Sequence, residues 1–488
     1  MTVVIVLGLL AMGFLPPIKI GDHILRKVDL LADIRTDTTT NSLPEIDIPD
    51  LEDLINEDLE KEKNSISSAS DSLIIPTQDS IPVEPTPEHS KIIGDDSWQS
   101  VDTNEEGVTY IVDYSKGTKH GISTFYRALT GLKEEDNAVR IAFFGDSFIE
   151  GDILTSDLRS LLQSEYGGSG VGFVSITSQT NGFRPTVVHS FGGWNSYSAT
   201  DKSGYKTSNL GIAGHYFTTN QSAYVELRGQ KKYGAHLDTC AVSTIYFKNR
   251  DQIQLTAKVN NEEPVSFDIP QTEELQAIEV KGSIGKIRWN AKADSTDLFY
   301  GVAMDGDRGI SLDNFSLRGS AGHYINTVPK KNMIEFNKLR PYNLIVLQYG
   351  LNVLSTEVYD YNYYRLVMKK VITYLKEVFP NSGILLVSVG DRDYKNTEGK
   401  YTTMPELKYF LDIQRQIAKE NNIAFWNMFE AMGGLNSMKS YVDSSPAKAN
   451  LDYTHINFRG GKAIAKKLME SLTQGVKDFE NGEIYEGE

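Results

Sequence analysis

The sequence predicts an α/β fold, a doubly wound parallel sheet flanked by helices and interrupted by an inserted β-sandwich of jelly-roll type. Apolar strand-like runs alternate with helical runs in residues 101–182 and again in residues 308–480. This alternation is typical of a parallel sheet with helices on its faces. Residues 183–307 instead contain short runs of alternating apolar and polar residues with turn residues between them, a pattern typical of a sandwich.

The first α/β part ends in a candidate nucleophile. We expect a helix over residues 122–130, a strand over 140–145 and a helix over 153–165. Gly145-Asp146-Ser147 follows the strand directly, so Ser147 is expected on a strand-to-helix turn. Such a turn suits a nucleophile, because the first turn of a helix offers backbone N–H groups to the oxyanion that forms.

Chain length also indicates the insert. Ser147 and the second motif residue, Asn352, are 205 positions apart, more than one compact α/β domain requires. Strands are expected within the insert over residues 221–227, 242–247, 254–259 and 286–291. Several aromatic rings here could stack on sugars, although core or edge packing is the commoner use of any one ring. They are Trp194, Tyr197, Tyr205, Tyr216 and Trp289.

The second α/β part supplies two further motifs. Its expected strands are 312–317, 344–348, 383–389 and 423–426, and its expected helices are 361–379, 405–420 and 458–472. Asn352 follows one of these strands closely, so its amide is a candidate donor to an oxyanion. Asp452-Tyr453-Thr454-His455 places a carboxylate three residues before an imidazole, which suits a general base and the group that orients it.

In this chain order, the three motifs resemble the signature of the SGNH (GDSL-type) hydrolases. The resemblance implies that Ser147 is the nucleophile and that His455 and Asp452 complete a catalytic triad. It also implies an oxyanion hole formed by Ser147, Gly319 and Asn352. Gly319 is the expected signature glycine, and Gly322 is the alternative. The lipase-type Gly-x-Ser-x-Gly motif is absent around Ser147.

An inserted β domain at this place is similar to the arrangement in peptidoglycan O-acetylesterases, where the insert is like a carbohydrate-binding module. The resemblance implies an exported carbohydrate O-acetylesterase acting on peptidoglycan or another acetylated polysaccharide of the cell envelope. Three alternatives stay open at this point. They are a polysaccharide O-acetyltransferase with the same triad, a non-catalytic glycan-binding envelope protein, and a lipase or thioesterase.

The N-terminal residues differ in composition from the rest of the chain. Residues 1–18 carry no charged side chain, so a signal or membrane anchor is expected over residues 1–20, with the mature protein in the periplasm or cell envelope. Residues 21–100 are expected to form an acidic disordered linker. Residues 28–100 hold 18 Asp and Glu but 4 Lys and Arg, a balance of −14 within a net charge of −16.

Composition excludes several other classes. The acidic balance argues against nucleic-acid binding through a basic face. The single cysteine, Cys240, excludes an intramolecular disulfide and a cysteine-based zinc site, and is expected to be a small buried apolar residue. The histidines form no His-Glu-x-x-His motif. We therefore expect no metal and no cofactor.

Overall fold

The computed structural model describes residues 19–20, 23–24, 102–132, 137–201 and 204–483. The chain divides into two units, Met1–Val83 and Glu84–Glu488. In the first unit, β1 (Lys19–Ile20) pairs antiparallel with β2 (His23–Ile24). Apart from these four residues, the expected anchor and acidic linker lie outside the described residues. No helix in the described ranges has the length and apolar character needed to cross a membrane.

A six-stranded sheet with the order β16-β4-β17-β18-β21-β3 lies in the second unit. Five of its strands are parallel, and β3 at one edge is antiparallel to β21. The sequence prediction missed β3, because three residues are too few to establish an alternating pattern. The strands are β3 (Ile111–Asp113), β4 (Ala138–Gly145), β16 (Gly309–Ser316), β17 (Leu344–Gln348), β18 (Gly383–Val387) and β21 (Ala424–Trp426).

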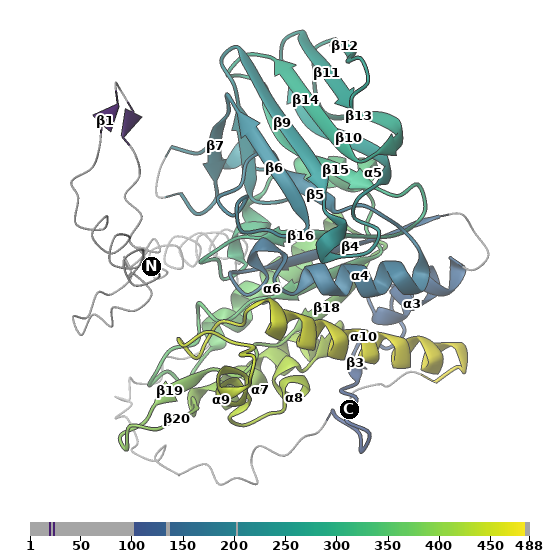
Figure 1. Ribbon diagram of the computed structural model, residues 1–488. Coiled ribbons are helices and arrows are strands. Elements are labelled where there is room, and N and C mark those ends of the chain that lie inside the picture. The colour runs from purple at the N-terminus through teal and green to yellow at the C-terminus, as the bar shows by residue number, and fades with distance from the viewer. Residues whose placement is uncertain (1–18, 21–22, 25–101, 133–136, 202–203, 484–488) are drawn as a thin grey trace, which may run out of the picture. The chain divides into compact units, whose positions relative to one another are not determined.

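The helices pack in two groups, α3, α4 and α10 together and α5, α6 and α7 together. Figure 1 shows α3, α4 and α10 side by side. Each long helix buries one stripe of side chains at helical spacing, as Tyr364, Met368 and Leu375 do in α6. The helices are α3 (Ile122–Gly131), α4 (Thr155–Tyr166), α5 (Lys330–Leu339), α6 (Asn362–Val378), α7 (Glu406–Glu420), α8 (Met428–Met432), α9 (Ser437–Asp443) and α10 (Phe458–Glu480).

Two helix boundaries differ from the prediction. A single turn of 3-10 helix, η2 (Glu150–Asp152), precedes α4, and within it Gly151 and Asp152 adopt positive φ angles of 61° and 65°, which an α-helix does not contain. As a result α4 begins at Thr155. At the other end of the chain, α10 continues past the predicted end at residue 472, because its buried stripe extends to Val476.

Two large antiparallel sheets accompany the parallel one (Figure 1), and β19 (Asp393–Lys395) and β20 (Tyr401–Thr403) form a small two-stranded one. One has the order β13-β10-β15-β8-β7, with β5 also paired to β15, and the other has the order β12-β11-β14-β9-β6. The mixed α/β architecture is thus confirmed. The strands are β5 (Gly172–Ser175), β6 (Val187–Gly192), β7 (Asn195–Ser198), β8 (His215–Thr218), β9 (Ser222–Gly229), β10 (Cys240–Asn249), β11 (Ile253–Val259), β12 (Val265–Ile269), β13 (Thr272–Ile284), β14 (Lys286–Lys292) and β15 (Leu298–Asp305).

Apolar side chains from both antiparallel sheets form one buried cluster, separate from the core of the parallel sheet. Trp289 belongs to this cluster and donates its indole N–H to Ser243 Oγ at 3.2 Å. Tyr216 is also buried and stacks on Tyr197. These two buried rings, Trp289 and Tyr216, are therefore unable to serve as sugar-stacking surfaces. Cys240 is buried, as predicted.

A buried charged cluster joins β15 of the antiparallel sheet to β16 of the parallel sheet. Arg340, directly after α5, donates from Nη1 to Asp305 Oδ2 and from Nε to Asp313 Oδ2, each at 2.6 Å. The Tyr342 hydroxyl donates to the same Asp313 oxygen at 2.6 Å. Because Asp305 lies on β15 and Asp313 on β16, the cluster fixes one sheet against the other.

Candidate active site

The strand register brings the predicted motifs to one edge of the parallel sheet. Ser316, the last residue of β16, is paired with Gly145 at the end of β4, and Gln348 at the end of β17 is paired with the same glycine. The loops after these three strands therefore begin side by side. This edge, at the carboxyl ends of parallel strands, is where open α/β sheets bind their ligands.

Ser147 lies on a tight turn after β4. Asp146 Oδ1 accepts the Phe148 N–H at 3.0 Å, and the carbonyl of Ser147 accepts the Glu150 N–H at 3.3 Å. A Cβ on Gly145 would lie 2.8 Å from the Ile149 side chain and 3.0 Å from the Gln348 carbonyl oxygen, so a larger residue there would push on both neighbours. Because α4 begins only at Thr155, Ser147 is followed by the η2 turn and does not lie at the N-terminus of a long helix.

His455 lies on the loop that leads into α10. Asn457 caps this helix, because its side chain accepts the N–H groups of Arg459 and Gly460. In the first turn of α10, a Cβ on Gly461 would lie 1.9 Å from the carbonyl oxygen of Ile153. Only glycine allows this approach, and it brings the start of α10 against the segment that follows Ser147.

Ser147, His455 and Asp452 form a continuous hydrogen-bonded chain. Ser147 Oγ is 3.0 Å from His455 Nε2, and His455 Nδ1 is 2.7 Å from Asp452 Oδ2. Asp452 Oδ1 also accepts the backbone N–H groups of Thr454 and His455, each at 3.0 Å. With the proton on Nδ1, the imidazole can accept the serine proton at Nε2.

The surroundings of Asp452 favour its ionised form. Partial burial acts to raise its pKa, but the hydrogen bonds from His455 and Thr454 together hold the pKa below the usual value. The Asp452 and His455 side chains remain 48% and 39% exposed. A charged carboxylate can therefore stabilise the imidazolium that forms when His455 takes a proton.

Asn352 links the nucleophile turn to the loop after β16. Its Nδ2 donates to the carbonyl of Ser320 at 3.0 Å and to Asp146 Oδ2 at 3.2 Å. Both amide hydrogens thus have a partner in the protein. For Asn352 to donate to an oxyanion, one of these two hydrogen bonds has to be exchanged for the new one.

The two candidate glycines after β16 differ in their hydrogen bonding. The N–H of Gly322 donates to Ser320 Oγ at 3.0 Å. Among the described residues, the N–H groups of Ser147 and Gly319 have no hydrogen-bond acceptor. Gly319 precedes Ser320, the acceptor of the Asn352 amide, and has a φ angle of 76°. The geometry therefore favours Gly319 over Gly322 as a donor beside Ser147.

Sequence reasoning gave no role to Asp146, although it is part of the first motif. Its side chain is buried, and burial is the main cause that raises its pKa to about 7. It accepts hydrogen bonds from Phe148 and Asn352 and so connects the turn of Ser147 to the amide. Its place between two motifs becomes visible only once the strands are paired.

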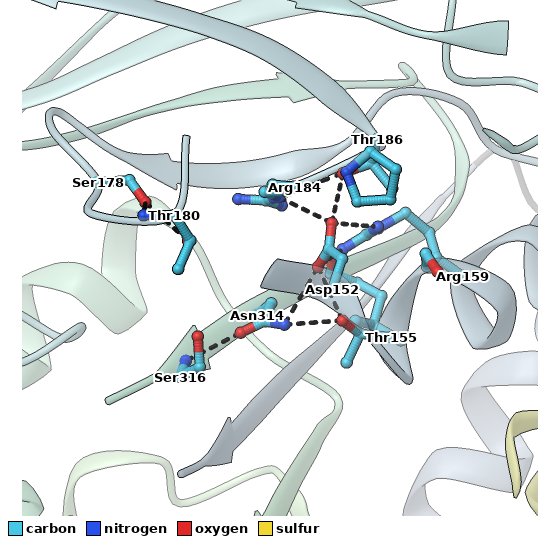
Figure 2. Close-up of polar contacts among 12 residues, drawn as sticks. Asp152, Thr155, Arg159, Ser178, Thr180, Arg184, Thr186, Asn314 and Ser316 are labelled. Atoms are coloured by element: carbon cyan, nitrogen blue, oxygen red, sulfur yellow. Dashed lines mark hydrogen bonds and ion pairs between the residues drawn. The ribbon is translucent and has the colours of Figure 1, made fainter. Parts of the chain in front are cut away.

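Asp152 is a second residue that the sequence did not indicate. Figure 2 shows this buried carboxylate among polar side chains from distant segments. It accepts hydrogen bonds from Thr155 at 2.7 Å, Arg184 at 2.8 Å and Asn314 at 3.1 Å, and forms an ion pair with Arg159 at 3.2 Å. Burial opposes ionisation, but the two arginines lower the pKa of Asp152 well below its usual value.

The Asp152 cluster also fixes the segment that begins at Ser147. Asn314 on β16 donates from Nδ2 both to Asp152 and to the carbonyl of Ile149, the latter at 2.8 Å. The sequence did not indicate this cluster, because Arg184 and Asn314 are 32 and 162 positions away from Asp152. In the part of the chain that the structure describes, no group of three or more His, Cys, Asp or Glu side chains is placed to hold a metal ion.

No protein-family model and no curated protein matches this chain. A solved peptidoglycan O-acetylesterase matches it with a TM-score of 0.61 and 20% identity, over 75% of this chain and 99% of the other. A Bacillus subtilis protein matches with a TM-score of 0.28 and 12% identity, over 68% and 97% of the two chains. A family two carbohydrate esterase from Clostridium thermocellum, solved with cellohexaose, has a TM-score of 0.26 and 10% identity, over 55% and 95%.

Of these three matches, the first has a TM-score above 0.5 and supports the fold assignment, while the other two fall below it. The first match extends over nearly the whole of that esterase, so it includes more than a single shared motif. This chain has the fold of that peptidoglycan O-acetylesterase and resembles the SGNH (GDSL-type) hydrolases.

Proposed function

We propose that this protein is an exported carbohydrate O-acetylesterase that uses Ser147 to remove acetyl groups from peptidoglycan or another envelope polysaccharide. The strongest support is the hydrogen-bonded chain of Ser147, His455 and Asp452, with distances of 3.0 Å and 2.7 Å. A serine hydroxyl is a weak nucleophile until a base removes its proton. This arrangement supplies that base at the correct nitrogen.

The reaction has two halves. In the first, Ser147 Oγ bonds to the acetyl carbonyl carbon while His455 Nε2 takes the hydroxyl proton. The bond between that carbon and the sugar oxygen then breaks, and the sugar oxygen receives the proton from His455. In the second, His455 deprotonates a water molecule that attacks the acetyl-enzyme. Acetate leaves, and Ser147 regains its proton from His455.

The oxyanion of each half forms beside three candidate donors. The N–H groups of Ser147 and Gly319 are available in this structure, and Asn352 can join them after exchanging its hydrogen bond to Asp146 or Ser320. Asp452 holds the Nδ1 proton of His455 and stabilises the transient imidazolium. Removing one oxyanion donor from a serine hydrolase costs about 10²–10³-fold in kcat.

The choice of an acetylated glycan rests on the fold and on the predicted domain organisation. The fold is that of a peptidoglycan O-acetylesterase, and residues 183–307 are proposed to form an inserted β-sandwich that shapes the cleft or holds the polymer. The apolar N-terminal residues 1–20 are proposed to export or anchor the chain, with residues 21–100 as a linker.

Acetate release from O-acetylated peptidoglycan, with acetylated xylan as comparison, tests this proposal. The full chain is assayed beside its Ser147→Ala variant. Serine-dependent release from peptidoglycan supports both the chemistry and the substrate, and serine-dependent release from xylan alone retains only the chemistry. Acetyl transfer to an added sugar acceptor without acetate release would favour a transferase. No turnover of any ester would contradict an enzymatic function.

A further inference from the structure

Phe183 is an exposed aromatic residue in the loop between β5 and β6. Its side chain is 52% exposed, which is among the largest values for an apolar residue in the described ranges. Single exposed apolar residues are common on protein surfaces and need no function by themselves. The position of this ring relative to the candidate active site therefore decides whether the ring has a function.

The ring of Phe183 lies between the segments that carry Ser147 and His455. A Cβ on Gly151, four residues after Ser147, would lie 2.5 Å from the nearest Phe183 ring atom, so the ring packs directly on this glycine. The ring centroid also lies 5.1 Å from that of Phe458, three residues after His455. The ring therefore contacts both of the segments that carry the serine and the histidine of the triad.

Polar contacts hold the loop of Phe183 in place. The N–H groups of Phe183 and Arg184 both donate to the carbonyl of Thr180 at 2.9 Å, which closes a tight turn. Arg184 then forms the buried ion pair with Asp152, the residue after Gly151 (Figure 2). These contacts position the ring. A ligand can therefore bind to its exposed part without first having to order the loop.

We infer that the exposed face of Phe183 is a platform for the sugar ring that carries the acetyl group, and that it determines specificity for glycan esters. This inference rests on the proposed function. A pyranose ring has an apolar face of C–H groups, and a flat aromatic ring offers it apolar contact area. A small acetyl ester contains no sugar ring and makes no such contact.

Steady-state kinetics with two substrates test this role. For Phe183→Ala, kcat/KM on O-acetylated glycan is expected to fall about tenfold, mainly through KM, because one face of a phenyl ring is lost from the contact. On a small alkyl acetate, which has no ring to place against Phe183, kcat/KM is expected to stay within about twofold. Phe183→Trp, which keeps an aromatic face, is expected to retain glycan activity.

Leu366→Ala is the matched control, because Leu366 is 51% exposed on α6 and lies outside both the motifs and residues 183–307. This variant is expected to leave kcat/KM unchanged on both substrates. An equal loss on both substrates with Phe183→Ala would show that the ring only supports the turn of Ser147. No loss on either substrate would show that the ring is not used. Each result would overturn the inference.

Calorimetric binding separates this inference from the proposed function. O-acetylated glycan fragments are titrated into Ser147→Ala and into the double variant Ser147→Ala with Phe183→Ala. An affinity about tenfold weaker in the double variant supports the platform, even where the wild-type chain proves unable to release acetate. Equal affinities contradict the platform, whatever the outcome of the acetate assay.

Discussion

Two clusters of charged residues in the same unit differ in almost every physical respect. Asp452 and His455 are 48% and 39% exposed and make one hydrogen bond between their side chains. In the Arg340 cluster, the side chains of Arg340, Asp305 and Asp313 are 2%, 6% and 0% exposed and each carboxylate receives several hydrogen bonds. A substrate can reach the first cluster, whereas the second is buried in the protein interior.

This difference separates reactivity from stability. A half-exposed carboxylate can be changed with little effect on folding, because water replaces the partner it loses. A buried charge that loses its partner remains without compensation in the protein interior. Substitutions in the two clusters should therefore have different effects. Changes at Asp452 or His455 should lower activity, and changes in the Arg340 cluster should lower the free energy of unfolding.

Ser147→Ala should give the largest effect on activity. With the nucleophile removed, we expect kcat on a soluble acetyl ester to fall by about 10⁴–10⁶-fold. The midpoint of thermal unfolding should stay within about 2 °C of wild type, because the change removes one hydroxyl from a partly exposed site. Residual activity above about a hundredth of wild type would show that another group performs the attack.

Asp452→Asn tests the role of the carboxylate in the triad. An amide at this position cannot hold the Nδ1 proton of His455 as a carboxylate does, so kcat is expected to fall about 10³–10⁴-fold. The free energy of unfolding, measured by urea titration, should change by less than about 1 kcal/mol. A large loss of stability with little loss of kcat would reverse the assignment of this cluster.

Arg340→Met tests the buried cluster. Removing the guanidinium leaves Asp305 and Asp313 buried without their cation, so we expect the free energy of unfolding to fall by about 3–5 kcal/mol. Lys330→Met is the matched control, because its ion pair with Glu377 is about half exposed and is worth about 0–1 kcal/mol. Equal effects of the two substitutions in urea titrations would contradict the distinction drawn from burial.

Asp146 gives a pH-dependent prediction. Burial raises its pKa to about 7 in the folded chain, whereas the unfolded value is about 3.9. Between these values the folded state binds the proton more tightly than the unfolded state, so stability falls as pH rises from about 4 to 7. Asp146→Asn removes this proton, and the difference in unfolding free energy between the two proteins should change by about 2–4 kcal/mol over that range.

Urea titrations of wild type and Asp146→Asn at several pH values measure this difference. The variant should lose less stability than wild type as pH rises through the window. A difference that stays constant between pH values of about 4 and 7 would show that Asp146 titrates normally. A difference that changes with the opposite sign would show that the carboxylate form is the one stabilised by folding.

The parts of the structure that the sequence predicted are those encoded locally. Apolar runs such as the one ending at Gly145 mark the parallel strands, and Asp452 and His455 are close because they are three residues apart. Ser147 and His455 are 308 residues apart, yet the structure brings them within hydrogen-bond distance. They come together because the motifs lie in loops at the same edge of one sheet.

Contacts between distant segments were not predictable in this way. Asp152 accepts hydrogen bonds from Arg184 and Asn314, which are 32 and 162 positions away, and no spacing rule joins these positions. A role for the exposed ring of Phe183 is indicated only by its contacts with Gly151 and Phe458. These are tertiary contacts, and periodicity within one segment carries no information about them.

Covalent labelling of the nucleophile tests the central claim most directly. The full chain is treated with an alkyl fluorophosphonate, which reacts with serines that a neighbouring base activates, and the labelled peptide is identified by mass spectrometry. We predict a single label on Ser147 that is lost in His455→Ala, because Ser147 Oγ lies 3.0 Å from His455 Nε2. A label on another residue, or no label on Ser147 in the folded wild-type chain, would contradict the proposed site.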